Sequence, residues 1–238
     1  MNSELGILLV TAASIGFIHT IIGPDHYLPF IMLAKASKWS RSKTIIITVI
    51  SGMGHVLSSV VIGLIGIAFG IALSKLEMFE SFRGNIAAYM LIAFGLIYTL
   101  YGIRKAIRGK PHIHSYVHYD GDLHTHDHSH NSHEHFHPHE ERDASKIKFW
   151  TIFAIFVLGP CEPLIPILMY PAAKSSILGM ILVTVVFGIV TIGTMLTVVM
   201  LSLKGINMLP LAKLEKYMDA IAGVVILLSG LSIQIFSL

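Results

Sequence analysis

The sequence predicts an all-α integral membrane protein with six transmembrane helices, arranged as a 3+3 inverted repeat in which helices 1 and 4 are broken. Composition is the first observation: of 238 residues, 54% are hydrophobic and 13% are charged, with a mean hydropathy of +0.72. Soluble domains carry about 25% charge. The other two observations are six long apolar segments and a bias of basic residues toward alternate connections between them.

The six apolar segments define the predicted spans. They lie at about 4–34, 43–74, 85–107, 148–173, 176–203 and 215–237, and the first and fourth are interrupted. A helix crosses hydrocarbon with roughly 20 residues, so each segment is long enough for one crossing. Two three-helix halves follow, residues 1–107 and 148–238, joined by a polar loop at 108–147. The first apolar run has no basic leader and no clear cleavage site, so we expect a retained span rather than a signal peptide.

Basic residues indicate the orientation of these spans. Fourteen of the 17 Lys and Arg fall on the connections 1–2, 3–4 and 5–6, whereas Lys75, Arg83 and Lys174 fall on the other side. The positive-inside rule then predicts a multi-pass protein of the plasma (inner) membrane, with both termini outside and the 108–147 loop in the cytoplasm. Because the basic residues record orientation, the pI near 8.9 does not indicate nucleic-acid binding.

The two interruptions resemble each other. GPDHYLP at 23–29 aligns with GPCEPLIP at 159–166 at an offset of 136 residues, and Gly52 meets Gly188 at the same offset. An odd number of spans per half gives the halves opposite orientations, as in transporters with paired broken helices around a central site. Chance is the alternative, since Gly-Pro is a common dipeptide. The predicted helix-breaking residues are Gly23, Pro24, Pro29, Gly159, Pro160, Pro163 and Pro166.

Ionisable side chains gather at the breaks and in the second span. A break at membrane depth is tolerated where it lines a cavity, and ionisable groups there mark an ion or substrate pathway by default. Imidazole, carboxylate and thiolate together favour borderline divalent transition ions, whose ligands must be deprotonated. For His19 and His55 a packing role is the alternative, and for Asp25 with His26 it is an interfacial loop. The predicted midplane cation site comprises His19, Asp25, His26, His55, Cys161 and Glu162.

The polar loop carries most of the histidines. Eleven of the chain's 14 lie between residues 112 and 139, interleaved with Asp and Glu. Such a tract lacks apolar periodicity, is expected to be disordered without metal, and offers imidazoles that are mostly neutral at pH 7. We expect it to capture metal ions, with a polar linker or an expression tag as alternatives. Its histidines are His112, His114, His118, His124, His126, His128, His130, His133, His135, His137 and His139.

His19 followed by Asp25 and His26, together with the His-rich loop, resembles the nickel/cobalt transporter and efflux families. The resemblance implies transport of Ni²⁺ or Co²⁺, with Zn²⁺ or Fe²⁺ as further candidate substrates and no organic cofactor. A capture tract on the cytoplasmic side suits export, storage or sensing better than scavenging from outside. We therefore expect a membrane exporter, not an enzyme, whose partners are metal ions, protons and the lipid bilayer, with a homo-oligomer as a candidate assembly.

GPCEPLIP is similar to the broken helices of the CcdA/DsbD transmembrane thiol carriers and of the wider LysE-type superfamily, which have six-span inverted repeats. The thiol carriers need a cysteine in each half, whereas this chain has Asp25 in the first position and Cys161 as its only cysteine. An intrachain redox pair is therefore excluded. Two alternatives stay open: a redox carrier that uses Cys161 with partner proteins, and an exporter of a small solute or sulfur-containing anion, which acidic Asp25 and Glu162 disfavour.

Overall fold

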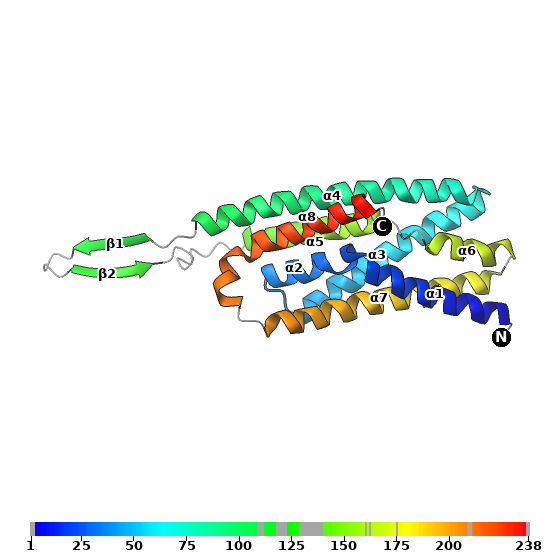
Figure 1. The fold of residues 1–238 in the computed structure, drawn as a ribbon, viewed down its shortest axis with the longest axis horizontal. Coiled ribbons are helices and arrows are strands. Elements are labelled where there is room, and N and C mark those ends of the chain that lie inside the picture. Colours follow the sequence, from blue (N-terminus) through cyan, green and yellow to red (C-terminus); the bar gives the residue numbers. More distant parts are fainter. Residues whose placement is uncertain are drawn as a thin grey trace.

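A computed structural model describes most of the chain, namely residues 3–108, 112–117, 123–128, 140–159, 161, 163–174, 176–208 and 211–236. Apart from one hairpin, the described elements are helical (Figure 1). In chain order they are α1 Ser3–Ile22, η1 Pro24–His26, α2 Leu28–Ala36, α3 Arg41–Ala68, α4 Leu73–Arg108, β1 His112–Val117, β2 Leu123–His128, α5 Glu140–Leu158, α6 Leu164–Ala173, α7 Ile177–Asn207, η2 Leu211–Tyr217 and α8 Met218–Phe236.

Five helical stretches of the described chain are long and apolar enough to cross a membrane, and they coincide with α1, α3, α4, α7 and the stretch Leu214–Ile235. Their outward faces are apolar: Val10, Ile97 and Ile189 are each about two-thirds exposed. Exposed apolar surface on this scale fits a lipid environment rather than water. The predicted span at 148–173 is represented by the apolar stretch Phe149–Leu158 and by α6, so a sixth crossing and the inverted repeat stay predictions.

The described helices end at both predicted interruptions. The first falls between α1 and α2, where Pro24 opens the short 3₁₀ helix η1 and Pro29 lies in the first turn of α2. The second falls between the end of α5 at Leu158 and the start of α6 at Leu164. Proline has no backbone amide to donate, so the first turn of a helix accommodates it best. Pro166, predicted as a helix-breaking residue, lies in the first turn of α6, and α6 also contains Pro171, so neither of these two prolines interrupts the helix.

The long helix α4 departs from the prediction. It begins at Leu73, twelve residues before the expected start of the span at 85, and Arg83 lies inside it rather than on a connection. Arg83 forms an ion pair with Glu80, one turn earlier, and both side chains are buried. Because paired charges are far less costly to bury than single ones, this turn belongs to the helix although its local hydropathy is low. The preceding helix α3 ends at Ala68, before the expected boundary at 74, and Gly70 adopts φ +61° in the turn.

The polar loop contains one described hairpin. Strands β1 and β2 pair antiparallel, with His112 opposite His128 and His114 opposite His126. The expectation of a wholly disordered loop is therefore wrong for these two strands. The remaining loop histidines, His118, His130, His133, His135, His137 and His139, lie outside the described residues.

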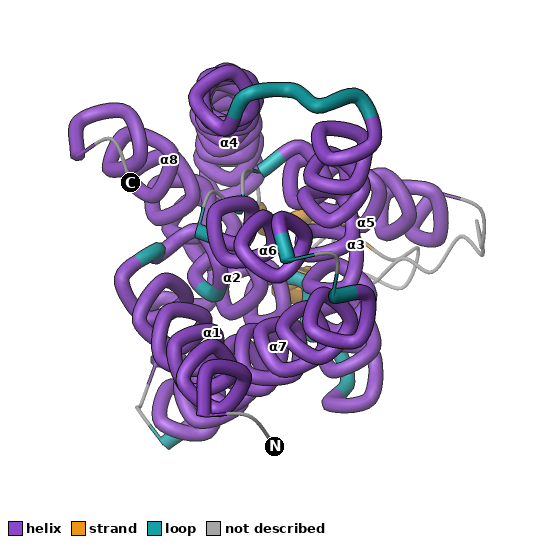
Figure 2. The backbone as a smooth tube through the Cα atoms, turned by 90° about the vertical axis from the view of Figure 1, so that its right-hand side faces the viewer, coloured by secondary structure: helices purple, strands orange, loops and turns teal. Residues whose placement is uncertain are grey.

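The helices run roughly along one long axis (Figure 1). The links from α2 to α3 and from α7 to α8 lie at the end that carries the hairpin, and the links from α3 to α4 and from α6 to α7 lie at the opposite end. Viewed along this axis, the short helices α2 and α6 lie near the centre, surrounded by the longer helices (Figure 2). Residues Pro29–Ala34 of α2 are accordingly all buried.

Small residues hold α4 against α8. A Cβ atom added at Gly95 or Gly102 would lie within 3.0 Å of the backbone of α8, and one at Gly223 would lie equally close to Thr99 of α4. Close backbone approach at small residues is the usual way in which helices pack tightly inside a membrane. The phenol of Tyr98 donates to Asp219 Oδ1 across this interface at 2.6 Å. The α4–α8 interface thus fixes the position of α4 at the side of the bundle.

Candidate functional site

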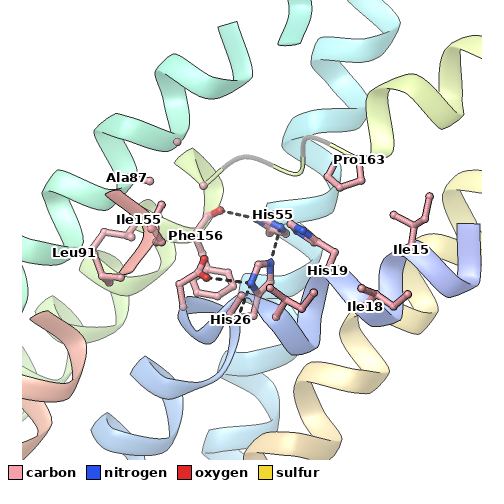
Figure 3. Close-up of a pocket in the computed structure, with 16 residues that line it drawn as sticks. Ile15, Ile18, His19, His26, His55, Ala87, Leu91, Ile155, Phe156 and Pro163 are labelled. Atoms are coloured by element: carbon pink, nitrogen blue, oxygen red, sulfur yellow. Dashed lines mark hydrogen bonds and ion pairs between the residues drawn. The ribbon is translucent and has the colours of Figure 1, made fainter. Parts of the chain in front are cut away.

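A cavity of about 340 Å³ lies at the first helix break (Figure 3). Its walls come from α1, the 23–27 break, α3, α4, the end of α5, the second break and α8. Most of the lining is apolar, including Ile15, Ile18, Leu91 and Ile155. The ionisable residues that line it are His19, Asp25, His26 and His55, four of the six residues predicted for the cation site. A largely apolar cavity with a few converging polar groups is the usual form of a binding site.

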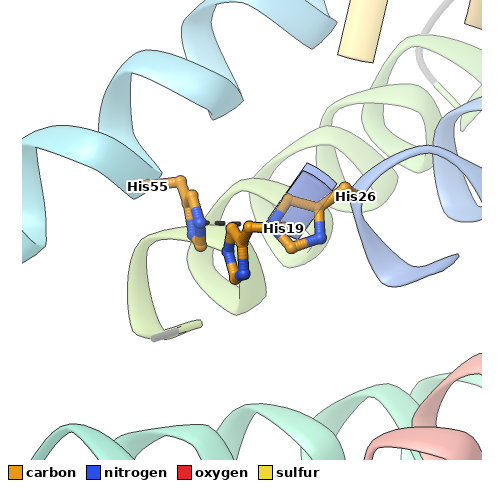
Figure 4. A group of neighbouring side chains, drawn as sticks. All are labelled: His19, His26 and His55. Carbon is orange, nitrogen blue, oxygen red and sulfur yellow. Dashed lines mark hydrogen bonds between the residues drawn. The ribbon is translucent and has the colours of Figure 1, made fainter. Parts of the chain in front are cut away.

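Three histidines converge in this cavity from separate elements (Figure 4). His19 lies in the last turn of α1, His26 in η1 and His55 in the middle of α3. One ring nitrogen from each lies within 4.8 Å of the others. The His26 and His55 side chains are buried, and the Nε2 atom of His19 is buried without a hydrogen-bond partner in the described structure.

The hydrogen bonds of the two buried rings assign their protons. Nδ1 of His26 lies 3.1 Å from the Gly23 carbonyl oxygen, and Nδ1 of His55 lies 3.3 Å from the Phe156 carbonyl oxygen. A carbonyl only accepts, so both Nδ1 atoms carry hydrogen and donate. In the neutral rings both Nε2 atoms are then lone-pair acceptors, and these atoms lie 3.3 Å apart. Two lone pairs this close repel each other, and a cation bound to both nitrogens would remove that repulsion.

A metal ion or a proton satisfies this arrangement. Two nitrogen ligands at 2.0–2.1 Å from a tetrahedral ion lie about 3.3–3.4 Å apart, and the two Nε2 atoms are 3.3 Å apart. If a proton takes that position instead, it forms an N–H···N hydrogen bond across the same gap. Nε2 of His19 is available as a third ligand atom. Metal and proton would therefore compete for the same two nitrogens.

Asp25 contacts the side of the His26 ring that is opposite His55. Its Oδ1 lies 3.3 Å from His26 Nδ1, the nitrogen that faces away from His55. A carboxylate that accepts from the far nitrogen of a ligating histidine fixes the tautomer and raises the basicity of the ring. Asp25 is thus placed to orient His26, whereas the sequence predicted it as a direct ligand.

The second break contributes differently. Cys161 is fully buried, packs in an apolar cluster with Val56 and Leu164, and does not line the cavity. Its amide donates to Ser59 Oγ and Glu80 Oε2, each at 3.2 Å. Glu162 and Pro160 lie outside the described residues. Gly159 and Pro163 do line the cavity.

The sequence reasoning missed Glu80 and Arg83. Both were assigned to the region before the third span, yet they form a buried ion pair next to the second break. Opposite charges three residues apart share one helix face, and the apolar neighbours Met78, Phe79 and Phe82 continue the helix. That pattern was the available signal for a longer third helix.

Comparison with family models, curated proteins and solved structures gives no match. The chemistry of the cavity therefore has to be inferred from its own residues.

Proposed function

We propose that this chain is a transporter of divalent transition-metal ions, Ni²⁺- or Co²⁺-like, with Zn²⁺ and Fe²⁺ as further candidates. It would cross the plasma membrane six times as a 3+3 inverted repeat. Nε2 atoms of His26 and His55 would bind the ion, with His19 as a third ligand and Asp25 holding the His26 ring. One observation carries the proposal: the Nε2 atoms of two buried histidines lie 3.3 Å apart beside a third imidazole, whose Nε2 has no partner among the described residues.

Proton exchange follows from the same geometry. Metal ligands must be deprotonated, so a bound proton has to leave before the ion enters. The hydrogen bonds of both Nδ1 atoms keep the two Nε2 atoms directed at one position, where either cation fits but not both. A gradient of protons across the membrane would then drive metal in the opposite direction.

Export is the proposed direction. The His-rich segment follows α4 at the end of the bundle that also holds the α2–α3 and α7–α8 links. These connections and the helix ends that flank them carry most of the Lys and Arg, which favours a cytoplasmic location. The segment would raise the local concentration of the ion at the cytoplasmic mouth.

The test is metal accumulation in inverted membrane vesicles that contain the protein. Vesicles with an acidic lumen should take up Ni²⁺ or Co²⁺ faster than protein-free vesicles, because the cytoplasmic face is outside and protons leave as metal enters. An ionophore that collapses the proton gradient should remove the difference. Equal uptake by protein-containing and protein-free vesicles for every one of these ions would contradict the proposal.

The loop histidines should affect the apparent affinity for the ion and not the capacity to transport. Replacing all eleven histidines between residues 112 and 139 with glutamine should raise the half-saturating metal concentration severalfold, because tethered ligands increase the effective concentration of the ion. The maximal uptake rate in the vesicle assay should stay near wild type. Complete loss of uptake with intact membrane insertion would show that the segment belongs to the permeation path.

Cys161→Ser should leave most of the uptake intact. The thiol is fully buried outside the cavity, and it is the backbone amide of this residue that makes the polar contacts. Serine keeps that amide and is close to cysteine in size. Loss of all activity in Cys161→Ser, with the variant correctly folded, would favour a thiol carrier that works through mixed disulfides with partner proteins.

A further inference from the structure

The buried ion pair on α4 has no role in the coordination described above. The Glu80 side chain is fully buried and that of Arg83 is 8% exposed. Removing a charge from water costs several kcal/mol even after relaxation, so such a pair persists only where its remaining polar atoms are satisfied. Here the partners of both residues lie on α3 and on the two sides of the second break.

The pair matches the polarity of the two helix ends that it joins. Nη2 of Arg83 donates to the Val157 carbonyl oxygen at 2.8 Å, in the last turn of α5. Oε2 of Glu80 accepts from the Cys161 amide at 3.2 Å, just before α6 begins. A helix end exposes carbonyls and a helix start exposes amides, so a cation suits the first and an anion the second. In a membrane no water is present to do this instead.

The same contacts extend to His55. Arg83 Nη2 also donates to Ser58 Oγ at 2.9 Å, and that hydroxyl donates to the backbone carbonyl of His55 at 2.8 Å. The carbonyl that accepts from His55 Nδ1 belongs to Phe156, next to Val157 in the chain. Arg83 thus contacts both the turn that carries His55 and the turn that orients its ring. Glu80 adds a second tie to α3, because it accepts from Ser59 Oγ at 3.0 Å.

We propose that the Glu80–Arg83 pair positions His55: it holds α3 and the end of α5 together so that Phe156 fixes the imidazole with Nε2 directed into the cavity. The inference rests on the proposed metal site, and it adds two positioning residues that do not touch the ion. Groups of this kind, behind the ligands, typically change metal affinity by about 10- to 100-fold when mutated.

The experiment measures Co²⁺ binding to the purified full-length chain in which the eleven loop histidines are glutamine, so that only the cavity titrates. Visible absorption of bound Co²⁺ reports the ligand geometry as well as the affinity. Arg83→Gln and the neutral double variant E80Q/R83Q should weaken Co²⁺ binding by about 10- to 100-fold and alter the absorption spectrum. Arg83→Lys should fall between these variants and wild type, because an ammonium keeps the charge but lacks the planar fork that serves several acceptors together.

Tyr98→Phe is the matched control. It removes a buried hydrogen bond of the same helix, to Asp219, but at the α8 interface and away from the second break. Thermal stability should fall in Tyr98→Phe, while the Co²⁺ affinity and spectrum should not change. A purely structural role for the ion pair predicts that its variants behave like Tyr98→Phe.

The outcomes separate the two proposals. If the loop-substituted parent binds no Co²⁺ in the cavity, the proposed function fails and the positioning role fails with it. If the parent binds and the folded ion-pair variants bind equally well with the same spectrum, only the positioning role is overturned. Should Arg83→Gln fail to fold, the double variant and Arg83→Lys decide the question, because neither contains a buried carboxylate without a cationic partner.

Discussion

Replacing His26 with alanine should reduce metal uptake to the level of protein-free vesicles. The change removes one of the two nitrogens that face each other at 3.3 Å and leaves His55 Nε2 without a partner. Two remaining imidazoles, one from α1 and one from α3, do not hold a divalent ion as three do. The measurement is Ni²⁺ or Co²⁺ uptake into inverted vesicles, with the amount of inserted protein determined in parallel.

A matched control guards against a trivial loss of fold. Ser229→Ala also removes a buried polar side chain, but one that bonds within α8 at Val225 and takes no part in lining the cavity. Ser229→Ala should transport normally. Wild-type uptake in His26→Ala would contradict the assignment of the site, whereas a protein that no longer inserts would move the test to His26→Gln, which keeps a polar side chain of similar size.

Gly23→Ala should impair the same site without removing any ligand. A Cβ atom at position 23 would lie within 3.0 Å of Nδ1 of His26, so the ring has to move away from its present place. Nδ1 would then lose the Gly23 carbonyl, and Nε2 would turn from His55. We expect Co²⁺ affinity to fall by about 10- to 100-fold, as for other groups that orient a metal ligand, with only a small change in thermal stability.

Gly193→Ala is the control for this glycine. Position 193 lies in α7, and a Cβ atom there would meet nothing within 4 Å, so the substitution adds a methyl group to open space. It should bind Co²⁺ as the wild type does. Unchanged affinity in Gly23→Ala would show that the ring position set by the break does not matter for binding.

Much of the local architecture was predictable because proline and glycine act locally. Gly23, Pro24 and Pro29 predicted the first interruption, and Gly159, Pro160 and Pro163 predicted the second, because proline lacks the amide of a helical hydrogen bond and the conformational freedom of glycine weakens a helix. The apolar segments predicted helices α1, α3 and α7, because a run of about 20 apolar residues indicates a membrane-spanning helix from local composition alone. These features need no knowledge of tertiary packing.

Features that depend on contacts between distant segments were not predictable. The start of α4 at Leu73 was missed because hydropathy counts Glu80 and Arg83 as charges, whereas burial depends on their pairing with each other and with α3 and α5. The role of Asp25 depends on the turn of η1, which directs its carboxylate to the far nitrogen of His26. Cys161 shares the second break with two cavity-lining residues, yet packs against α3 instead.

The convergence of the three histidines lies between these two cases. Their restriction to the first two predicted spans suggested a common site, but the distance between His19 and His26 depends on how η1 turns the chain. With the observed turn, the ring centroids of His19 and His26 are 4.7 Å apart. The ring centroids of His26 and His55 are 5.0 Å apart. A regular helix through residues 19–26 would have separated His19 and His26 by about two turns, roughly 10 Å along the axis.

The central claim is that one divalent ion binds between His26 and His55. Crystals of the full-length protein grown with Co²⁺ or Ni²⁺, measured at the absorption edge of the metal, test it most directly. We expect an anomalous peak at about 2.0–2.2 Å from Nε2 of both His26 and His55, with Nε2 of His19 turned toward it. Metal-loaded crystals with anomalous density at the 112–139 segment but none in the cavity would contradict it.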